Sequence, residues 1–215
     1  NYVDVNLALL RSSVFHSGNA ISRAISSEEP LFIRPFSFDI NEPNQLVDHH
    51  LAKVNINWWY NENDKLSFVF GRQLNKRKEF DVRRNAEKPI IDLDLITTDL
   101  MIDWDHSFSE NSDGLLGLHF FNQDNDNNPG TGTTPYIPNY NTNRYSFFLI
   151  ENLKFGNKQF EIGIRVDNED YNVRGREVSQ KIFRDEHSLT NTTFSVGFEN
   201  KLSERFSFRT NLGSA

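Results

Sequence analysis

The 215-residue chain contains no cysteine, so disulfide bonds and cysteine-ligated metal sites are excluded. It also has no apolar run approaching the roughly 20 residues that a transmembrane helix needs. A basic surplus is lacking too, because 30 Asp and Glu residues outnumber 23 Lys and Arg residues. The resulting net charge of −7 argues against nucleic-acid binding, which usually shows a basic footprint. These absences leave an all-β membrane protein open, since alternating strands never look strongly hydrophobic in a sliding window.

Aromatic residues are abundant in a chain that is otherwise polar. Phenylalanine alone accounts for 19 residues, although the mean hydropathy is only −0.61. This combination is unusual for a compact globular core. It suits a structure with one thin apolar skin and a wet interior.

Strict alternation of apolar and polar residues is clearest in residues 159–167. Successive side chains of a strand point to opposite faces, so this segment predicts a ribbon with one apolar and one charged side. The apolar side is Phe160, Ile162, Ile164 and Val166, and the other is Glu161, Gly163, Arg165 and Asp167. Similar segments lie at residues 2–10, 53–60, 66–70, 98–108, 116–120, 145–149, 194–198 and 206–208.

The connections between these segments alternate between short and long. Short polar turns are expected at residues 61–64, 109–113, 156–157 and 201–204, and long polar connections at residues 11–45, 74–90, 123–143 and 168–188. This rhythm places all long loops on one side of a sheet, as a transmembrane β-barrel requires. We therefore predict an all-β fold, an antiparallel up-and-down meander of about nine strands that is part of a transmembrane β-barrel.

Aromatic residues cluster beside the expected short turns. Trp58, Trp59 and Tyr60 precede one turn, Trp104 and Phe108 precede another, and Phe155, Phe160 and Phe206 flank two more. Such rings favour the membrane interface, so the cluster predicts an aromatic belt. The alternative is a set of aromatic plugs at the end of a soluble sandwich core.

Two motifs invite a metal interpretation. The pair His49 and His50 would point to opposite faces of a strand, which disfavours chelation of one ion. Residues 124–130 (DNDNNPG) resemble a calcium loop faintly, but Pro129 stands where an EF-hand needs glycine and Pro135 where it needs glutamate. We expect no bound metal and no cofactor. No nucleophile elbow or phosphate-binding glycine loop indicates an enzyme.

The chain resembles the barrel of a TonB-dependent outer-membrane receptor. Residues 160–167 (FEIGIRVD) are similar to a strand that recurs in that family, and residues 135–140 (PYIPNY) before a strand are similar too. Residues 206–215 (FSFRTNLGSA) resemble the strand that the family continues into an aromatic-Arg-Thr-Pro sequence. The likeness is one of pattern, and it covers essentially the whole chain.

The resemblance implies a 22-stranded barrel, a plug domain that closes it, and an inner-membrane TonB complex that engages a segment ahead of the plug. Neither end of the chain shows a signal peptide or a plug, so we expect residues 1–215 to be a partial barrel domain. The expected function is energised uptake of a siderophore, cobalamin or glycan across the bacterial outer membrane. The expected partners are that ligand, outer-membrane lipid, the rest of the barrel and plug, and the TonB complex.

Six residues are candidates for contact with a ligand, in the lumen or the outer loops: Arg77, Arg83, Arg84, Tyr136, Tyr140 and Arg165. The first three belong to a basic stretch that also includes Arg72, Lys76 and Lys78, and that would attract an anionic chelate or lipid phosphates. A solvated loop balanced by Glu79 and Asp81 is the alternative for that stretch. Glu161, Arg165 and Asp167 could equally form salt bridges along a lumen wall.

Two other functions remain open at this point. A passive porin would have the same strands around an open lumen. A soluble β-sandwich binding module would use the apolar faces of its strands as an ordinary core.

Overall fold

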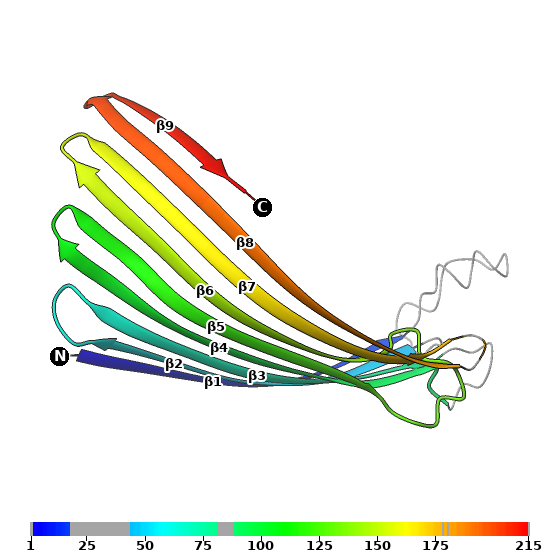
Figure 1. Cartoon of the computed structure of the whole chain (residues 1–215). Helices are drawn as coiled ribbons and strands as arrows, with labels where there is room; N and C mark the ends of the chain where they lie inside the picture. Colours follow the sequence, from blue (N-terminus) through cyan, green and yellow to red (C-terminus); the bar gives the residue numbers. More distant parts are fainter. Residues whose placement is uncertain (1, 18–43, 81–87, 178, 180, 215) are drawn as a thin grey trace, which may run out of the picture.

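The computed structural model describes residues 2–17, 44–80, 88–177, 179 and 181–214, and all of its regular structure is β-strand. The strands are β1 (Tyr2–Ser17), β2 (Asn44–Trp59), β3 (Lys65–Phe80), β4 (Ile91–Ser109), β5 (Ser112–Asn127), β6 (Asn139–Phe155), β7 (Lys158–Arg176), β8 (Ile182–Ser203) and β9 (Phe206–Gly213). They form one sheet in the order of the sequence, with every neighbouring pair antiparallel (Figure 1). The prediction of a meander of about nine strands is confirmed.

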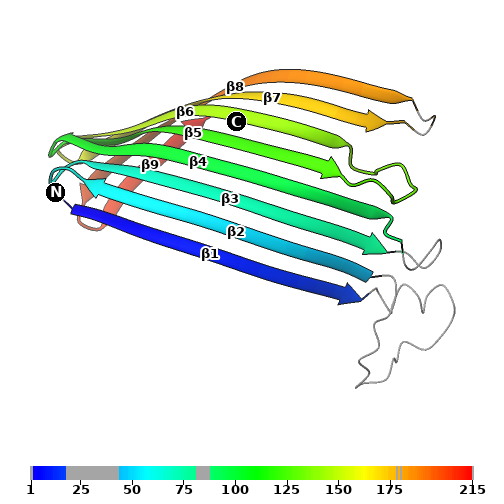
Figure 2. The same cartoon turned by 90° about the horizontal axis from the view of Figure 1, so that it is seen from below.

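Short and long connections lie at opposite ends of the strands, as predicted (Figure 2). Residues 60–64, 110–111, 156–157 and 204–205 make the tight connections, and we call this side the turn end. The connections at residues 128–138 and 177–181 lie at the other side, the loop end. The β6–β7 connection shows why these turns are tight: Gly156 adopts a φ of 62°, which a two-residue hairpin loop favours and which most other residues avoid.

The strands are longer than the sequence pattern predicts. Eight of the nine contain 16 residues or more where alternation ended after about ten, and β8 reaches 22 residues. The expected long connections at residues 123–143 and 168–188 shrink accordingly to residues 128–138 and 177–181. Alternation fails as a signal there because both faces of a strand become polar at the loop end. Roughly 9–11 residues suffice to cross a bilayer, so these strands extend beyond it.

The register assembles the apolar residues into one continuous face. Phe70 of β3 lies opposite Val54 and Leu100, and Ile164 of β7 lies opposite Leu149 and Phe194. The predicted continuity of the β7 and β8 apolar faces follows directly from this pairing. On the other face, polar residues such as Asn55, Ser67, Asp103 and Ser146 alternate with the apolar ones.

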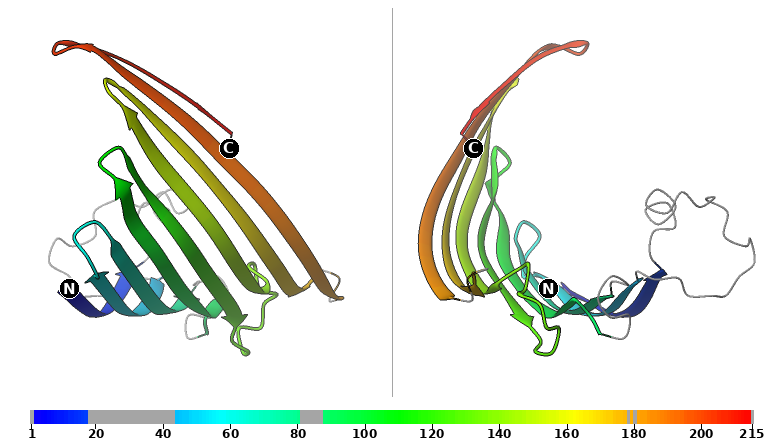
Figure 3. Two further views of the ribbon diagram at one scale, coloured as in Figure 1. Left: turned by 60° about the vertical axis from the view of Figure 1, so that its left-hand side comes forward. Right: turned by 90° about the vertical axis from the view of Figure 1, so that its right-hand side faces the viewer.

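The sheet is strongly curved, and its polar face is the inner one. Figure 3 shows the nine strands as an arc. Side chains crowd on the inner side of an arc, and six of the seven buried non-glycine residues in the described part lie on the polar face: Ser67, Leu93, Asp103, Asn125, Thr142 and Ser146. We call this the concave face and the apolar one the convex face.

The described residues form a single layer without an apolar core. Leu93 is their only buried hydrophobic residue, whereas large apolar side chains of the convex face are exposed, for example Leu118 at 57% and Phe194 at 50%. A soluble sandwich would cover such a face with a second sheet. A barrel wall in a membrane needs no such cover, because in that setting lipid meets the apolar face.

Aromatic rings line the convex face near the turn end, where the belt is predicted. Ring centroids lie 5.7 Å apart for Trp58 and Tyr60, and 4.9 Å apart for Phe160 and Phe198. The prediction is wrong for Trp59, which lies on the concave face. Its ring packs 5.1 Å from that of Tyr2, because each strand residue faces opposite to its neighbours in sequence.

One buried side chain, His106, lies on the convex face of the described residues. His106 Nε2 lies 2.9 Å from Glu151 Oε1, across the intervening strand β5. Gly114 of β5 makes the bridge possible, since a Cβ there would come within 2.7 Å of Glu151 Oε2. The rings of Trp104 and Phe108 lie 4.7 and 4.5 Å from the imidazole and shield the pair from lipid.

Candidate functional site

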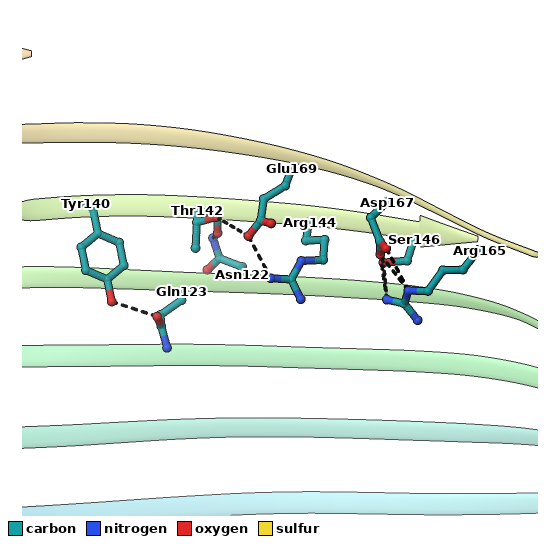
Figure 4. Close-up of polar contacts among 9 residues, drawn as sticks. All are labelled: Asn122, Gln123, Tyr140, Thr142, Arg144, Ser146, Arg165, Asp167 and Glu169. Carbon is teal, nitrogen blue, oxygen red and sulfur yellow. Dashed lines mark hydrogen bonds and ion pairs between the residues drawn. The ribbon is translucent and has the colours of Figure 1, made fainter. Parts of the chain in front are cut away.

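The concave face carries a wall of paired polar side chains across β4 to β7. Figure 4 shows the part of it on β5, β6 and β7. The register places the even-numbered residues of β6 beside the odd-numbered residues of β5 and β7 on this face. We call this surface the lumen wall. Its residues come from three or four strands at once, so the wall exists only after the sheet has assembled.

Arg165 lies in the first cluster of the lumen wall. Its Nε donates hydrogen bonds of 3.0 Å to both carboxylate oxygens of Asp167, and its Nη2 donates to Ser146 Oγ at 2.9 Å. The buried Ser146 hydroxyl donates in turn to Asp167. The guanidinium also stands 5.9 Å from the centroid of the Phe148 ring. The cluster is therefore satisfied internally and held against an aromatic face.

Arg144 forms a second cluster of the same design, nearer the loop end. Its Nη2 donates to Glu169 Oε1 at 3.0 Å, and Thr142 Oγ1 donates to the same oxygen at 3.2 Å. The guanidinium lies 5.4 Å from the centroid of the Phe121 ring. Repetition of an arginine, a carboxylate and an aromatic ring on neighbouring strands gives the wall matched charges and rigid side chains.

Tyr140 joins the wall through an uncharged chain of hydrogen bonds. Its hydroxyl donates to Gln123 Oε1 at 2.8 Å, and Gln123 Nε2 donates to Thr97 Oγ1 at 3.1 Å. This chain links β6, β5 and β4 across the concave face. The neighbouring His119 lies 2.9 Å from Asp99 Oδ1 and continues the wall toward the turn end.

The structure brings only some of the predicted ligand residues together. Tyr140 and Arg165 lie on the lumen wall. Arg77 lies on the same concave face but on β3, outside that wall, and forms an ion pair with Glu79 of its own strand. Tyr136 lies in the β5–β6 connection and is 93% exposed. Arg83 and Arg84 lie outside the described residues.

The predicted basic loop is wrong in its first part. Arg72, Lys76, Arg77 and Lys78 belong to β3, whose pairing with β4 continues to Glu79. This part of β3 gives no strand signal in the sequence because neither of its faces is apolar. In the strand, Lys78 and Lys76 lie 3.3 and 3.9 Å from carboxylates of β4.

The described residues hold no group of three or more His, Asp or Glu side chains arranged to bind a metal. His49 and His50 point to opposite faces, as predicted: His49 Nδ1 lies 3.2 Å from Asn75 Nδ2, and His50 Nε2 lies 3.4 Å from Asp48 Oδ1. The weak calcium motif is partly strand β5, which separates Asp124 and Asn125 onto opposite faces.

A hollow of about 940 Å³ opens at the loop end beside the β5–β6 connection. Its lining combines the backbone and hydroxyl groups of residues 127–135 with Arg174 and Arg176 of β7. Thr133 Oγ1 donates to the carbonyl of Ile90 at 2.9 Å, and Asn128 Nδ2 donates to Asp92 Oδ1 at 2.8 Å. These contacts tie the connection to β4 and to the residue before it.

Sequence reasoning missed Arg144, Glu169, Phe121 and Phe148. Each lies in an alternating strand, so its face could be assigned, but its partners depend on the register between strands. Arg165 and Asp167 did signal such a cluster in the sequence, because opposite charges two residues apart share one face of a strand.

Within the described ranges, no helix has the length and apolar character that a membrane-spanning helix requires. No curated protein sequence matches the chain at a significant level.

Three solved structures share the fold at low sequence identity. The ferric-catecholate import receptor Fiu of E. coli K12 in its open form has a TM-score of 0.70 at 11% identity, over 98% of this chain and 44% of that one. The siderophore receptor PiuA of Acinetobacter baumannii has a TM-score of 0.68 at 9% identity, over 94% and 38%. The iron transporter FrpB of Neisseria meningitidis has a TM-score of 0.64 at 12% identity, over 97% and 34%. The chain thus spans less than half the length of these three proteins.

A comparison of the sequence with protein-family models agrees with the structural comparison. The family model described as "TonB dependent receptor-like, beta-barrel" matches residues 18–215, which is nearly the whole chain. With a curved antiparallel meander, an apolar convex face and a polar lumen wall, the chain belongs to the β-barrel family of TonB-dependent receptors, proteins of the Gram-negative outer membrane.

Proposed function

We propose that this chain forms part of the barrel of a receptor that imports a ferric chelate by energised uptake. The observation that carries the proposal is the lumen wall: a concave face of compensated charges behind an apolar convex face. Such a wall surrounds a wet interior through which a polar ligand passes. The hollow at the loop end is the proposed first contact for an anionic ligand; its lining includes Arg174 and Arg176, which stand on the convex side of β7 in the part of the strand that extends beyond the bilayer.

The choice of a ferric chelate over cobalamin or a glycan rests on two supports. The structural neighbours include a siderophore receptor, a ferric-catecholate import receptor and an iron transporter. The arginines of the hollow suit an anionic chelate better than a neutral sugar. In this proposal Tyr136 contacts the ligand at the surface, and Arg83 and Arg84 add positive charge to the neighbouring connection.

Within the same proposal, the lumen wall holds a plug domain supplied by another part of the protein. The paired state of Arg165 and Arg144 supports this role over direct ligand contact. Groups that are already satisfied present a fixed surface for docking and bind a passing anion weakly. A TonB complex would then act on the plug to open the lumen.

The test is an uptake assay with the full-length receptor in a Gram-negative host that lacks its own iron receptors. Radiolabelled ferric catecholate, ferric citrate and cobalamin are offered in turn, with and without a functional TonB complex. The proposal expects uptake of a ferric chelate that falls to background without TonB. Equal uptake in both hosts would indicate a passive porin, and uptake of cobalamin alone would contradict the choice of ligand.

A further inference from the structure

The convex face carries a second hollow, of about 500 Å³, where the apolar band meets polar residues on β1 to β3. On the convex face, its lining consists of three apolar and three basic residues. The apolar residues are Leu9, Ala52 and Leu74, and the basic residues are Arg11, His50 and Arg72. We call it the rim pocket. It lies on the opposite face of the sheet from the lumen wall, so a ligand in transit would not meet it.

Arg72 differs from the other cations of β3 on this face. Lys76 and Lys78 each stand opposite an aspartate of β4 and lie 3.9 and 3.3 Å from its carboxylate. Arg72 stands opposite Ala52 and Thr98. Its diagonal and same-strand neighbours on the face are His50, Val54, Ile96, Leu100, Phe70 and Leu74, none of them acidic. In the described part of the chain Arg72 therefore has no carboxylate partner.

Arg11 adds a second positive charge to the pocket, and His50 adds an imidazole. Both approach Asp48 at long range, with nitrogen to oxygen distances of 3.7 and 3.4 Å. Asp48 lies farther along β2 from Arg72 than His50 does, so the Asp48 carboxylate does not balance the charge of Arg72. The side chain of Arg11 remains 71% exposed.

The Arg72 guanidinium, which lacks a carboxylate partner among the described residues and stands at the border of the apolar band, is suited to bind an external anion. One row nearer the turn end, the face consists of Leu7, Val54, Phe70 and Leu100, which lipid chains cover. A charge so close to hydrocarbon is costly unless it is paired. Guanidinium groups bind phosphate oxygens bidentately, and the anion that reaches this height is a lipid headgroup.

We propose that the rim pocket binds one lipid that carries an exposed phosphate group, in the leaflet on the loop side. The phosphate lies between Arg72 and Arg11, and an acyl chain runs over Leu9 and Ala52 toward Val54. The apolar floor of the pocket continues the convex band, which is why a lipid fits and a free phosphate ion fits poorly. The site is independent of the imported ligand and needs only the assembled barrel in a bilayer.

Native mass spectrometry of the full-length receptor tests the site. The protein is reconstituted with equal amounts of phosphatidic acid and phosphatidylcholine of the same chain length, and retained lipids are counted. Wild type is expected to retain phosphatidic acid preferentially. Arg72→Gln removes charge-assisted hydrogen bonds and is expected to reduce that retention roughly tenfold, whereas Arg72→Lys keeps most of it.

The matched control is Arg184→Gln. Arg184 is also an exposed cation on the convex face at the loop end, but it lies on β8, opposite Arg174. Equal loss of retention in Arg72→Gln and Arg184→Gln would overturn the proposal in favour of diffuse charge attraction. If Arg72→Gln fails to fold by circular dichroism, Arg11→Gln replaces it, and a loss of retention is again the expected result.

A third experiment distinguishes binding of a lipid from binding of a free phosphate ion. Inorganic phosphate at millimolar concentration is expected to leave the retained phosphatidic acid in place, because the acyl chain contributes to binding. Displacement by inorganic phosphate would show a simple anion site and contradict the lipid. Ligand uptake by Arg72→Gln should remain at the wild-type level, so failure of the proposed import function is recognised separately.

Discussion

A glycine and an aromatic ring set the shape of the lumen wall around Arg165. The Phe148 ring lies over Gly117, where a Cβ would stand only 2.1 Å from the ring Cζ. The guanidinium of Arg165 lies against the same ring. The lack of a side chain at Gly117 therefore leaves room for the Phe148 ring. The ring in turn helps to hold the Arg165 guanidinium in place.

Gly117→Ala is expected to destabilise the barrel by about 1–3 kcal/mol, because the ring must leave its place. The measurement is the free energy of unfolding of the full-length protein in detergent or bilayers. Gly71→Ala is the control: it also lies on the concave face, but its Cβ would meet only Asp99 Cβ, at 4.0 Å. A cost at Gly71 equal to that at Gly117 would contradict the role of the ring.

We expect Arg165 to stabilise the barrel through its hydrogen bonds to Asp167. Arg165→Ala should cost about 1–3 kcal/mol in the wild-type protein, since it removes three donated hydrogen bonds from the cluster. In the Asp167→Asn background the cost should shrink, with a coupling energy on the order of 1 kcal/mol in a double-mutant cycle. Purely additive costs would show that the pair is not a unit.

At this scale, the sequence predicts which face a residue occupies and little of what it touches. The faces of Arg165, Asp167 and Ile164 follow from a period of two. The contact of Arg165 with Ser146 and Phe148 depends on the register of β6 against β7, which pairs Phe148 with Arg165. Register follows from turn geometry and from the whole apolar face, so no single segment specifies it.

Within a single strand, one face is apolar and the other is polar, as a boundary between lipid and water requires. On β7, Ile162 and Ile164 are 47% and 39% exposed on the convex face, while Gly163 between them is buried on the concave face. The sequence predicted this strand well over residues 159–167 and missed its extension to Arg176. Asn168, Asp170 and Asn172 continue the convex face there, and a polar face toward water gives no periodic signal.

Ile164→Arg is expected to destabilise folding into bilayers by about 2–4 kcal/mol if the residue lies near the bilayer midplane. The control is Glu161→Arg, an exposed position on the concave face of the same strand, which should be tolerated within about 0.5 kcal/mol. Both are measured as the stability of the full-length protein refolded into lipid. Equal effects of the two variants would mean that the convex face does not meet lipid.

At the scale of the molecule, the described sheet is open. β1 pairs only with β2, and β9 pairs only with β8. Unpaired strand edges are not tolerated in hydrocarbon, so both edges require partners in a membrane. The structural neighbours, of which this chain covers 34–44%, supply the reason to expect further strands from the same protein.

Residues 1–215 expressed alone are therefore not expected to form a stable monomer. Analytical ultracentrifugation with and without detergent should show self-association or aggregation, because the edges pair with other copies. A well-folded monomer in the absence of detergent would contradict this and would restore the soluble sandwich as an explanation.

The architecture itself was predictable because it rests on repeated signals: alternation in nine segments, four short turns and aromatic residues near those turns. Repetition averages out the ambiguity of any one strand. The ligand was not predictable, since the residues that select it lie in connections whose geometry depends on the whole loop end. Membership of the TonB-dependent receptor family settles the class of protein as a receptor and not an enzyme.

The central claim is that this sheet separates lipid on its convex face from water on its concave face. The chain has no cysteine, so single cysteines can be placed at each of residues 160–167 of the full-length receptor and spin-labelled in bilayers. Electron paramagnetic resonance then measures collisions with oxygen, which dissolves in lipid, and with a water-soluble nickel complex. We predict that oxygen reaches labels at even positions and nickel reaches labels at odd positions, in strict alternation. Nickel access at every position would contradict the account.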